Sequence, residues 1–165
     1  MKPSSKLNNK ISSIINLYSS GNISQALDDT QTLINQNPNE SILHNICGVC
    51  YKASSQLEMA TQYFEKAIEI KPDFADAHFN LALTLQEQNQ LEAAIKEYKV
   101  TLSLQNNYVK AFNNLGIIYK DLGQMENAIK SYEQAILLQP DYAEAHNNLG
   151  TTFQEFGQFE QALVS

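Results

Sequence analysis

The stretch VKAFNNLGIIYKDLGQMENAIKSYEQAILLQPDY, residues 109–142, predicts the fold of this chain. Its first half has the i, i+3, i+4, i+7 spacing that puts side chains on one helix face, at Phe112, Leu115, Gly116 and Tyr119. The same spacing returns from Ala128 to Ile136, after a break at Leu122-Gly123, and Pro140 ends the second segment. The stretch therefore predicts two antiparallel helices joined by a turn.

The pattern recurs every 34 residues along the chain. Three series keep this step: Ala26, Ala60, Ala94, Ala128 and Ala162; Pro38, Pro72, Asn106 and Pro140; and Gly48, Ala82, Gly116 and Gly150. A fixed period of this length is typical of stacked helical repeats, so we expect an all-α chain of helix pairs.

The period also predicts the domain organisation. We expect an N-terminal tail, a degenerate first pair, three complete pairs and a partial pair whose second helix is truncated after Gly157; these are residues 1–6, 7–40, 41–74, 75–108, 109–142 and 143–165. The abrupt end of the last pair suggests a piece cut from something longer.

Particular residue types are expected to shape the turns and the core. Pro72 and Pro140 end helices, and the aspartates that follow them are good N-cap residues for the next helix. Asn106, which replaces proline in the middle pair, should keep its turn because asparagine tolerates the left-handed conformation. Small residues such as Gly116 predict a close approach of helices, around which buried aromatic side chains pack, at Phe64, Tyr98 and Tyr132.

Composition bounds the function. The 165 residues are 43% hydrophobic and carry a net charge of −7, and every cation is a lysine, which disfavours a nucleic-acid partner. The first twenty residues lack the apolar run of a secretory signal, and no run is long enough to cross a membrane, so we expect a cytoplasmic protein. The lysines and apolar residues of the first helix could suit a membrane surface, but a first repeat must bury the same apolar stripe.

No residue pattern predicts catalysis or a cofactor. The sequence Cys47-Gly-Val-Cys50 lies in the middle of a predicted helix, so we expect buried structural cysteines rather than a redox motif. His44 beside these cysteines could be a third metal ligand, but His78 and His146 recur at the same repeat position without cysteines, so we expect no metal site. No nucleophile is paired with a base, and no glycine-rich phosphate loop is present.

The pattern from Phe112 to Pro140 resembles the tetratricopeptide repeat, in which W-x-x-L-G-x-x-Y is followed by A-x-x-x-F and then P. Nearly the whole chain shares the resemblance. The departures are local: histidines occupy the usual tryptophan position in three repeats, Thr101 replaces an alanine and Ala82 replaces a glycine.

The resemblance implies a right-handed superhelical solenoid whose first helices form a groove for peptides or segments of partner proteins. Seven side chains are expected on the groove: Asp76, Asn80, Lys110, Asn114, Glu144, Asn147 and Asn148. A column of amides at Asn80, Asn114 and Asn148 resembles the ladders of O-linked N-acetylglucosamine transferases and could bond a peptide backbone. The carboxylate clamp of co-chaperone repeats is disfavoured because its arginine is missing.

Other readings stay open at this stage. The amides could be solvated or could bond the neighbouring hairpin instead of a peptide. The chain could be the recognition arm of a larger glycosyltransferase or sulfotransferase. End-to-end self-association could use the apolar residues of the last pair, at Leu149, Phe153, Phe156 and Phe159.

Overall fold

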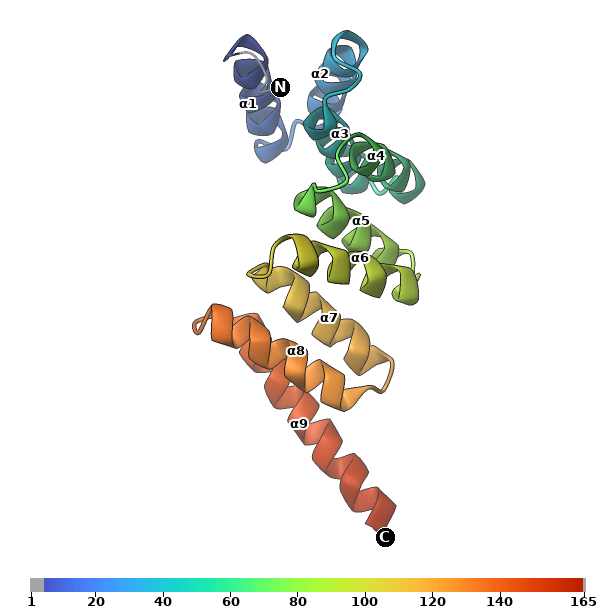
Figure 1. Ribbon diagram of the computed structural model, residues 1–165, viewed down its shortest axis with the longest axis vertical. Helices are drawn as coiled ribbons and strands as arrows, with labels where there is room; N and C mark the ends of the chain where they lie inside the picture. The colour runs from blue at the N-terminus through green and yellow to red at the C-terminus, as the bar shows by residue number, and fades with distance from the viewer. Residues whose placement is uncertain (1–4, 165) are drawn as a thin grey trace. The chain divides into compact units, whose positions relative to one another are not determined.

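The structure is a computed structural model that describes residues 5–164, and all regular secondary structure in these residues is helical. The predicted all-α class is confirmed. The chain divides into two compact units, Met1–Gln88 and Asn89–Ser165, which are considered separately below (Figure 1).

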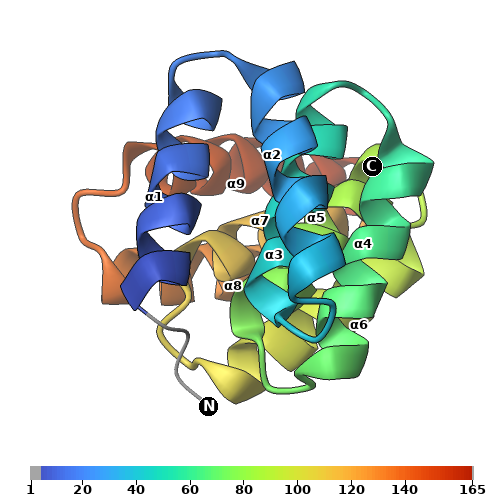
Figure 2. The same ribbon diagram turned by 90° about the horizontal axis from the view of Figure 1, so that it is seen from above.

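The first unit holds five helices: α1 Ser5–Ser19, α2 Ile23–Gln36, α3 Ser41–Ala53, α4 Leu57–Ile70 and α5 Ala75–Glu87. Each helix packs against the next one, and α3 also touches both α1 and α5. Figure 2 shows α1 and α2 side by side, and their apolar faces bury Ile14 and Leu33 in the core that they share with Leu43 of α3. The first helices of successive pairs therefore adjoin one another, as the repeat predicts.

The second unit holds four helices: α6 Leu91–Leu104, α7 Val109–Asp121, α8 Met125–Leu138 and α9 Ala143–Val164. The helix α7 packs against α6, α8 and α9, and α8 also packs against α9. The predicted pair 75–108 is divided, because α5 belongs to the first unit and α6 to the second. The predicted tail 1–6 is also too long: α1 begins at Ser5, and residues 1–4 lie outside the described part of the chain.

The turn inside each helix pair contains one residue with a left-handed backbone. The φ angles are 79° at Gly21, 58° at Ser55, 59° at Asn89 and 71° at Gly123, so these residues follow the 34-residue step. Glycine adopts this conformation without steric cost, whereas side chains with a Cβ are strained there. The glycines were predicted as turn residues, but the same role at Ser55 and Asn89 is visible only in the structure.

We expect Ser55→Gly to raise the free energy of unfolding by about 0.5–1 kcal/mol, because removing Cβ strain outweighs the entropy cost of glycine. Urea unfolding followed by circular dichroism measures the change. Ser54, with φ of −93°, is the control in the same turn, and Ser54→Gly should not stabilise the protein. A midpoint for Ser55→Gly at or below that of the parent would contradict the strain argument.

The last predicted pair differs from the prediction. Gly157 stands 34 residues after Gly123, yet its φ is not positive and α9 continues through it to Val164. The expected turn and separate second helix are therefore absent. The physical reason is length: residues 157–164 make roughly two turns, too few to bury an apolar face that would repay breaking the helix.

The turns between pairs form as predicted, but by different residues. The N-cap of α5 is Phe74, without a side-chain cap bond, so Asp73 is not the cap. Asp73 instead lies inside a tight turn closed by the Phe74 amide, which donates to the Lys71 carbonyl over 3.1 Å. The turn at Asn106 survives, but without the left-handed backbone that we expected there.

The small residues accommodate aromatic rings, which confirms the predicted packing. A Cβ added at Gly48 would lie 2.6 Å from the Phe64 ring, and one at Gly116 would overlap the Tyr132 ring. Both rings and that of Tyr98 are fully buried. A glycine on α3 and one on α7 thus provide the hollows into which the aromatic side chains of the paired second helices α4 and α8 fit.

The repeated histidines hold the turns between pairs. The imidazole Nε2 atoms of His44, His78 and His146 lie 2.8, 3.0 and 2.8 Å from the carbonyl oxygens of Pro38, Pro72 and Pro140. The pair 109–142 has neither residue type at these positions, since Phe112 and Asn106 replace them. Histidine and proline are thus present or absent together. Histidine recurs at this repeat position because its ring bonds the carbonyl of the proline six residues earlier.

Candidate functional site

The candidate site is the amide face, which we define as the surface of the first helices that carries Asn80 on α5, Asn114 on α7, and Asn147 and Asn148 on α9. Asn80 belongs to the first compact unit and the other three belong to the second. Asn147 is exposed, and the other three amides are half-buried. Each unit therefore presents its own part of the amide face.

Three of these amides each donate a hydrogen bond through Nδ2 to another side chain of the protein. The Nδ2 of Asn80 donates to Asn45 Oδ1 over 3.0 Å, and that of Asn148 donates to Asn113 Oδ1 over 3.1 Å. The Nδ2 of Asn114 donates to the hydroxyl of Tyr98 over 2.9 Å. Each amide thus uses one donor within the protein, while its Oδ1 receives no hydrogen bond from residues 6–157, whose side chains the structure describes.

Ion pairs join the same first helices, near the C-terminal ends of α3, α5 and α7 and in the middle of α9. Lys52 Nζ lies 2.6 Å from Glu87 Oε1 between α3 and α5, and Lys120 Nζ lies 2.8 Å from Glu155 Oε1 between α7 and α9. Both pairs repeat the 35-residue separation of the amide pairs, seven residues further along each helix. The helices α3 and α5, and likewise α7 and α9, are therefore held together at two levels, by a hydrogen bond between side-chain amides and by an ion pair.

The predicted charged residues all lie on exposed positions. Asp76 begins α5, Lys110 begins α7 and Glu144 begins α9, each within the first two residues of its helix. Glu144 contacts an amide: its Oε1 accepts from Asn113 Nδ2 over 3.0 Å, and its Oε2 accepts from the Tyr142 hydroxyl over 3.0 Å. Glu144, Asn113 and Asn148 form one connected network.

Negative charge gathers around a buried tyrosine in the second unit. Burial is the main cause that raises the pKa of Tyr132 to about 12, and the carboxylates of Asp121, Glu155 and Glu144 add to it. Burial and the Glu144 carboxylate likewise raise the pKa of Tyr142 to about 12. Both phenols therefore keep their protons at physiological pH, and that of Tyr142 donates to Glu144.

Two residues that bond the predicted amides were missed by the sequence analysis, Asn45 in the first unit and Asn113 in the second. Their signal was a second amide series one position before the predicted column, at Asn45, Asn113 and Asn147. Asn113 is fully buried although it is polar, which the sequence pattern alone does not indicate.

The cysteines behave as predicted. Cys47 and Cys50 are free thiols with no exposed surface. Burial raises the pKa of Cys47 to about 12 and that of Cys50 to about 11, so both are protonated and unreactive at neutral pH. Across residues 5–164, no three histidine, cysteine or acidic side chains are grouped as metal ligands would be.

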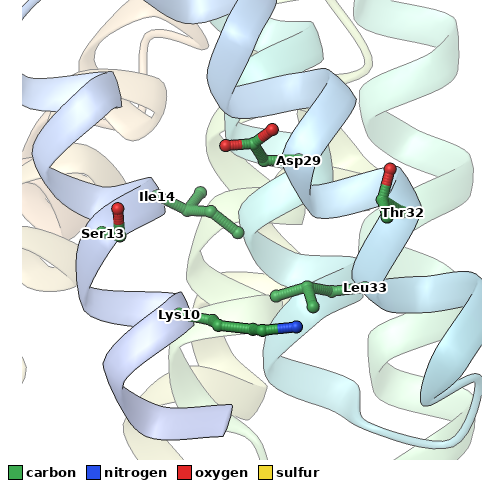
Figure 3. Close-up of a pocket in the computed structure, with 6 residues that line it drawn as sticks. All are labelled: Lys10, Ser13, Ile14, Asp29, Thr32 and Leu33. Carbon is green, nitrogen blue, oxygen red and sulfur yellow. The ribbon is translucent and has the colours of Figure 1, made fainter. Parts of the chain in front are cut away.

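A pocket of about 220 Å³ opens between α1 and α2 (Figure 3). Buried Ile14 and Leu33 point toward each other across it, with the charged groups of Lys10 and Asp29 near its edge. Asp29 already accepts a hydrogen bond from Gln25 over 2.7 Å. The pocket thus has an apolar floor, formed by Ile14 and Leu33, and a polar edge.

Known families match most of the chain. The family described as tetratricopeptide repeat matches residues 44–74 and 63–96, and that described as TPR repeat matches 85–123 and 116–157. In the described part of the chain, no helix is both long and apolar enough for a membrane span.

Curated relatives share one segment of the chain. Peroxisomal targeting signal receptors from Kluyveromyces lactis and Candida glabrata are 31% and 30% identical over 67 residues, which is 41% of this chain. The match spans 12% and 11% of those receptors, so this chain corresponds to a small part of each.

Solved structures share the fold. A crystal structure of MamA has a TM-score of 0.80 at 21% identity, covering 90% of this chain and 86% of that one. The first TPR of Spaghetti (RPAP3), bound to the HSP90 peptide SRMEEVD, has a TM-score of 0.70 at 22% identity, covering 72% and 94%. At these identities the likeness establishes the stacked helix-pair architecture alone.

Proposed function

Because this chain belongs to the tetratricopeptide repeat family, we propose that it is a protein-interaction scaffold that holds an extended segment of a partner against its amide face. The observation that carries the proposal is the hydrogen-bonding pattern that Asn80 shows in the first unit and that Asn114 and Asn148 show in the second. Each donates one hydrogen bond through Nδ2 within the protein, and its Oδ1 accepts none from the described side chains of residues 6–157. A peptide backbone supplies one N–H donor per residue, which suits such acceptors.

The relatives give this proposal context. The HSP90 peptide bound to the RPAP3 repeat shows a peptide held by a protein of the same fold. The peptide there ends in acidic residues, whereas this chain has no arginine with which to build a bidentate site for carboxylates. We therefore propose that the chain recognises the backbone of its partner rather than acidic residues at the partner's C-terminus.

The proposal extends to the class of partner and the compartment. The net charge of −7 without any arginine favours a protein partner over nucleic acid, because phosphate recognition needs clustered cations. Two buried free thiols suit a reducing compartment, and we propose the cytoplasm. The chain acts by binding, and we propose no catalytic role for it.

Replacing Asn114 and Asn148 together by alanine is expected to weaken binding of a phage-selected peptide by about tenfold or more, since each lost hydrogen bond is worth about 1 kcal/mol. Fluorescence anisotropy with the labelled peptide measures the affinity, and circular dichroism checks the fold. Asn127→Ala, on an exposed position of the second helix α8, is the control. Equal affinity of the double variant and the parent would remove the amide face from the proposal.

A further inference from the structure

Asn113 is a polar side chain that is fully buried on α7, so it cannot touch a binding partner directly. Both ends of its amide are nevertheless bonded to α9. Its Oδ1 accepts from Asn148 Nδ2 over 3.1 Å, and its Nδ2 donates to Glu144 Oε1 over 3.0 Å. The two residues that it contacts are both members of the predicted binding set.

These bonds fix the direction of the Asn148 amide. The amide group is planar, so holding Nδ2 against Asn113 also determines where Oδ1 lies. Among the side chains that the structure describes, those of residues 6–157, none donates to the Oδ1 of Asn148. Glu144 is held at both oxygens, by Asn113 and by the Tyr142 hydroxyl. Asn113 is therefore a buried residue of α7 that holds two polar side chains of α9, Glu144 and Asn148, in place.

The packing at this repeat position does not require an amide. The equivalent residue of α5 is Phe79, which is 8% exposed, so an apolar side chain occupies the same place in a neighbouring repeat. The equivalent residue of α3 is Asn45, whose Oδ1 accepts from Asn80 Nδ2 as Asn113 does from Asn148. The amide is thus present in both places where a following asparagine is bonded to it. Buried amides give less stability than well-packed apolar groups of similar volume, so a role other than stability is indicated.

We propose that Asn113 is a positioning residue that orients Asn148 so that its Oδ1 accepts a backbone N–H from an extended partner segment. The inference rests on the proposed function. It adds that at this point the protein supplies the hydrogen-bond acceptor and the partner supplies the donor. The partner must offer an unblocked backbone N–H at this point, and a proline or an N-methylated residue there is rejected.

The test compares two proteins with two peptides. The probe is a phage-selected peptide that binds the parent chain, together with analogues in which single backbone N–H groups are methylated. For the parent, methylation at one position should lower the affinity about tenfold, as expected for loss of one oriented hydrogen bond. For Asn113→Leu, the unmethylated peptide should bind about tenfold more weakly, and methylation at that position should have little further effect. The midpoint of unfolding should be unchanged or raised.

The outcomes distinguish failure of the proposed function from failure of the positioning role alone. If no selected peptide binds the parent chain, the proposed function fails and the positioning role fails with it. If Asn113→Leu binds as tightly as the parent with the same sensitivity to methylation, the positioning role is wrong while the scaffold function stands. Asn113→Ala, which removes the amide without adding volume, gives the same comparison if the leucine variant does not fold.

Discussion

Gly116→Ala is expected to destabilise the protein by about 1–3 kcal/mol, the usual cost of overpacking a dense core. The added methyl would overlap the Tyr132 ring, which is fully buried and cannot swing into solvent. The ring must shift or the helices α7 and α8 must separate. Urea unfolding followed by circular dichroism measures the loss, and an unchanged midpoint would show that the hollow is wider than its contacts indicate.

The matched control is Gly150→Ala at the same repeat position on α9. There the added Cβ meets no atom within 4 Å, so only helix propensity changes. Alanine is favoured over glycine inside a helix by about 1 kcal/mol, so this variant should be more stable than the parent. A loss of stability for Gly116→Ala and a gain for Gly150→Ala would separate the effect of the Tyr132 ring from that of helix propensity. Destabilisation by both substitutions would contradict the packing argument.

The helix pairs could be predicted from sequence because their signals are local and periodic. Gly48, Gly116 and the buried aromatic residues recur at fixed positions, and each position has one packing role. The left-handed backbone at Ser55 and Asn89 could not be predicted, because neither residue type requires it. The cap at Phe74 was missed because the turn closes one residue later than the aspartate rule suggests.

The amide face was predicted in part. Asn80, Asn114 and Asn148 were recognisable as a column, because the 34-residue step places them on equivalent helix faces. Their partners were not, since the bonds run between adjacent first helices with a separation of 35 residues that depends on how the helices stack. Asn113 reads as one more surface amide in the sequence, and only its burial reveals a different role.

Stability is expected to fall in alkali, and Cys47 has the largest single pKa shift among the buried thiols and phenols. Its thiol has no exposed surface, and burial raises its pKa from 9.0 to about 12, assisted by the nearby Cys50. In the unfolded chain the thiol loses its proton near pH 9, while the folded chain keeps it until about pH 12. Between these values the unfolded state binds fewer protons, so the free energy of unfolding decreases as pH rises. A shift of three units corresponds to about 4 kcal/mol, fully present below pH 9.

Cys47→Ala isolates this contribution, because alanine cannot ionise. The variant should be less stable than the parent at pH 8 owing to lost packing, and the difference should shrink and then reverse as pH rises from 9 toward 12. Urea midpoints under reducing conditions at a series of pH values give both curves. Tyr132→Phe is the reference for phenol ionisation, whose window begins at pH 10 rather than 9. Parallel curves for the parent and Cys47→Ala would mean that the thiol ionises as easily in the folded core as in water, which burial on α3 between packed helices forbids.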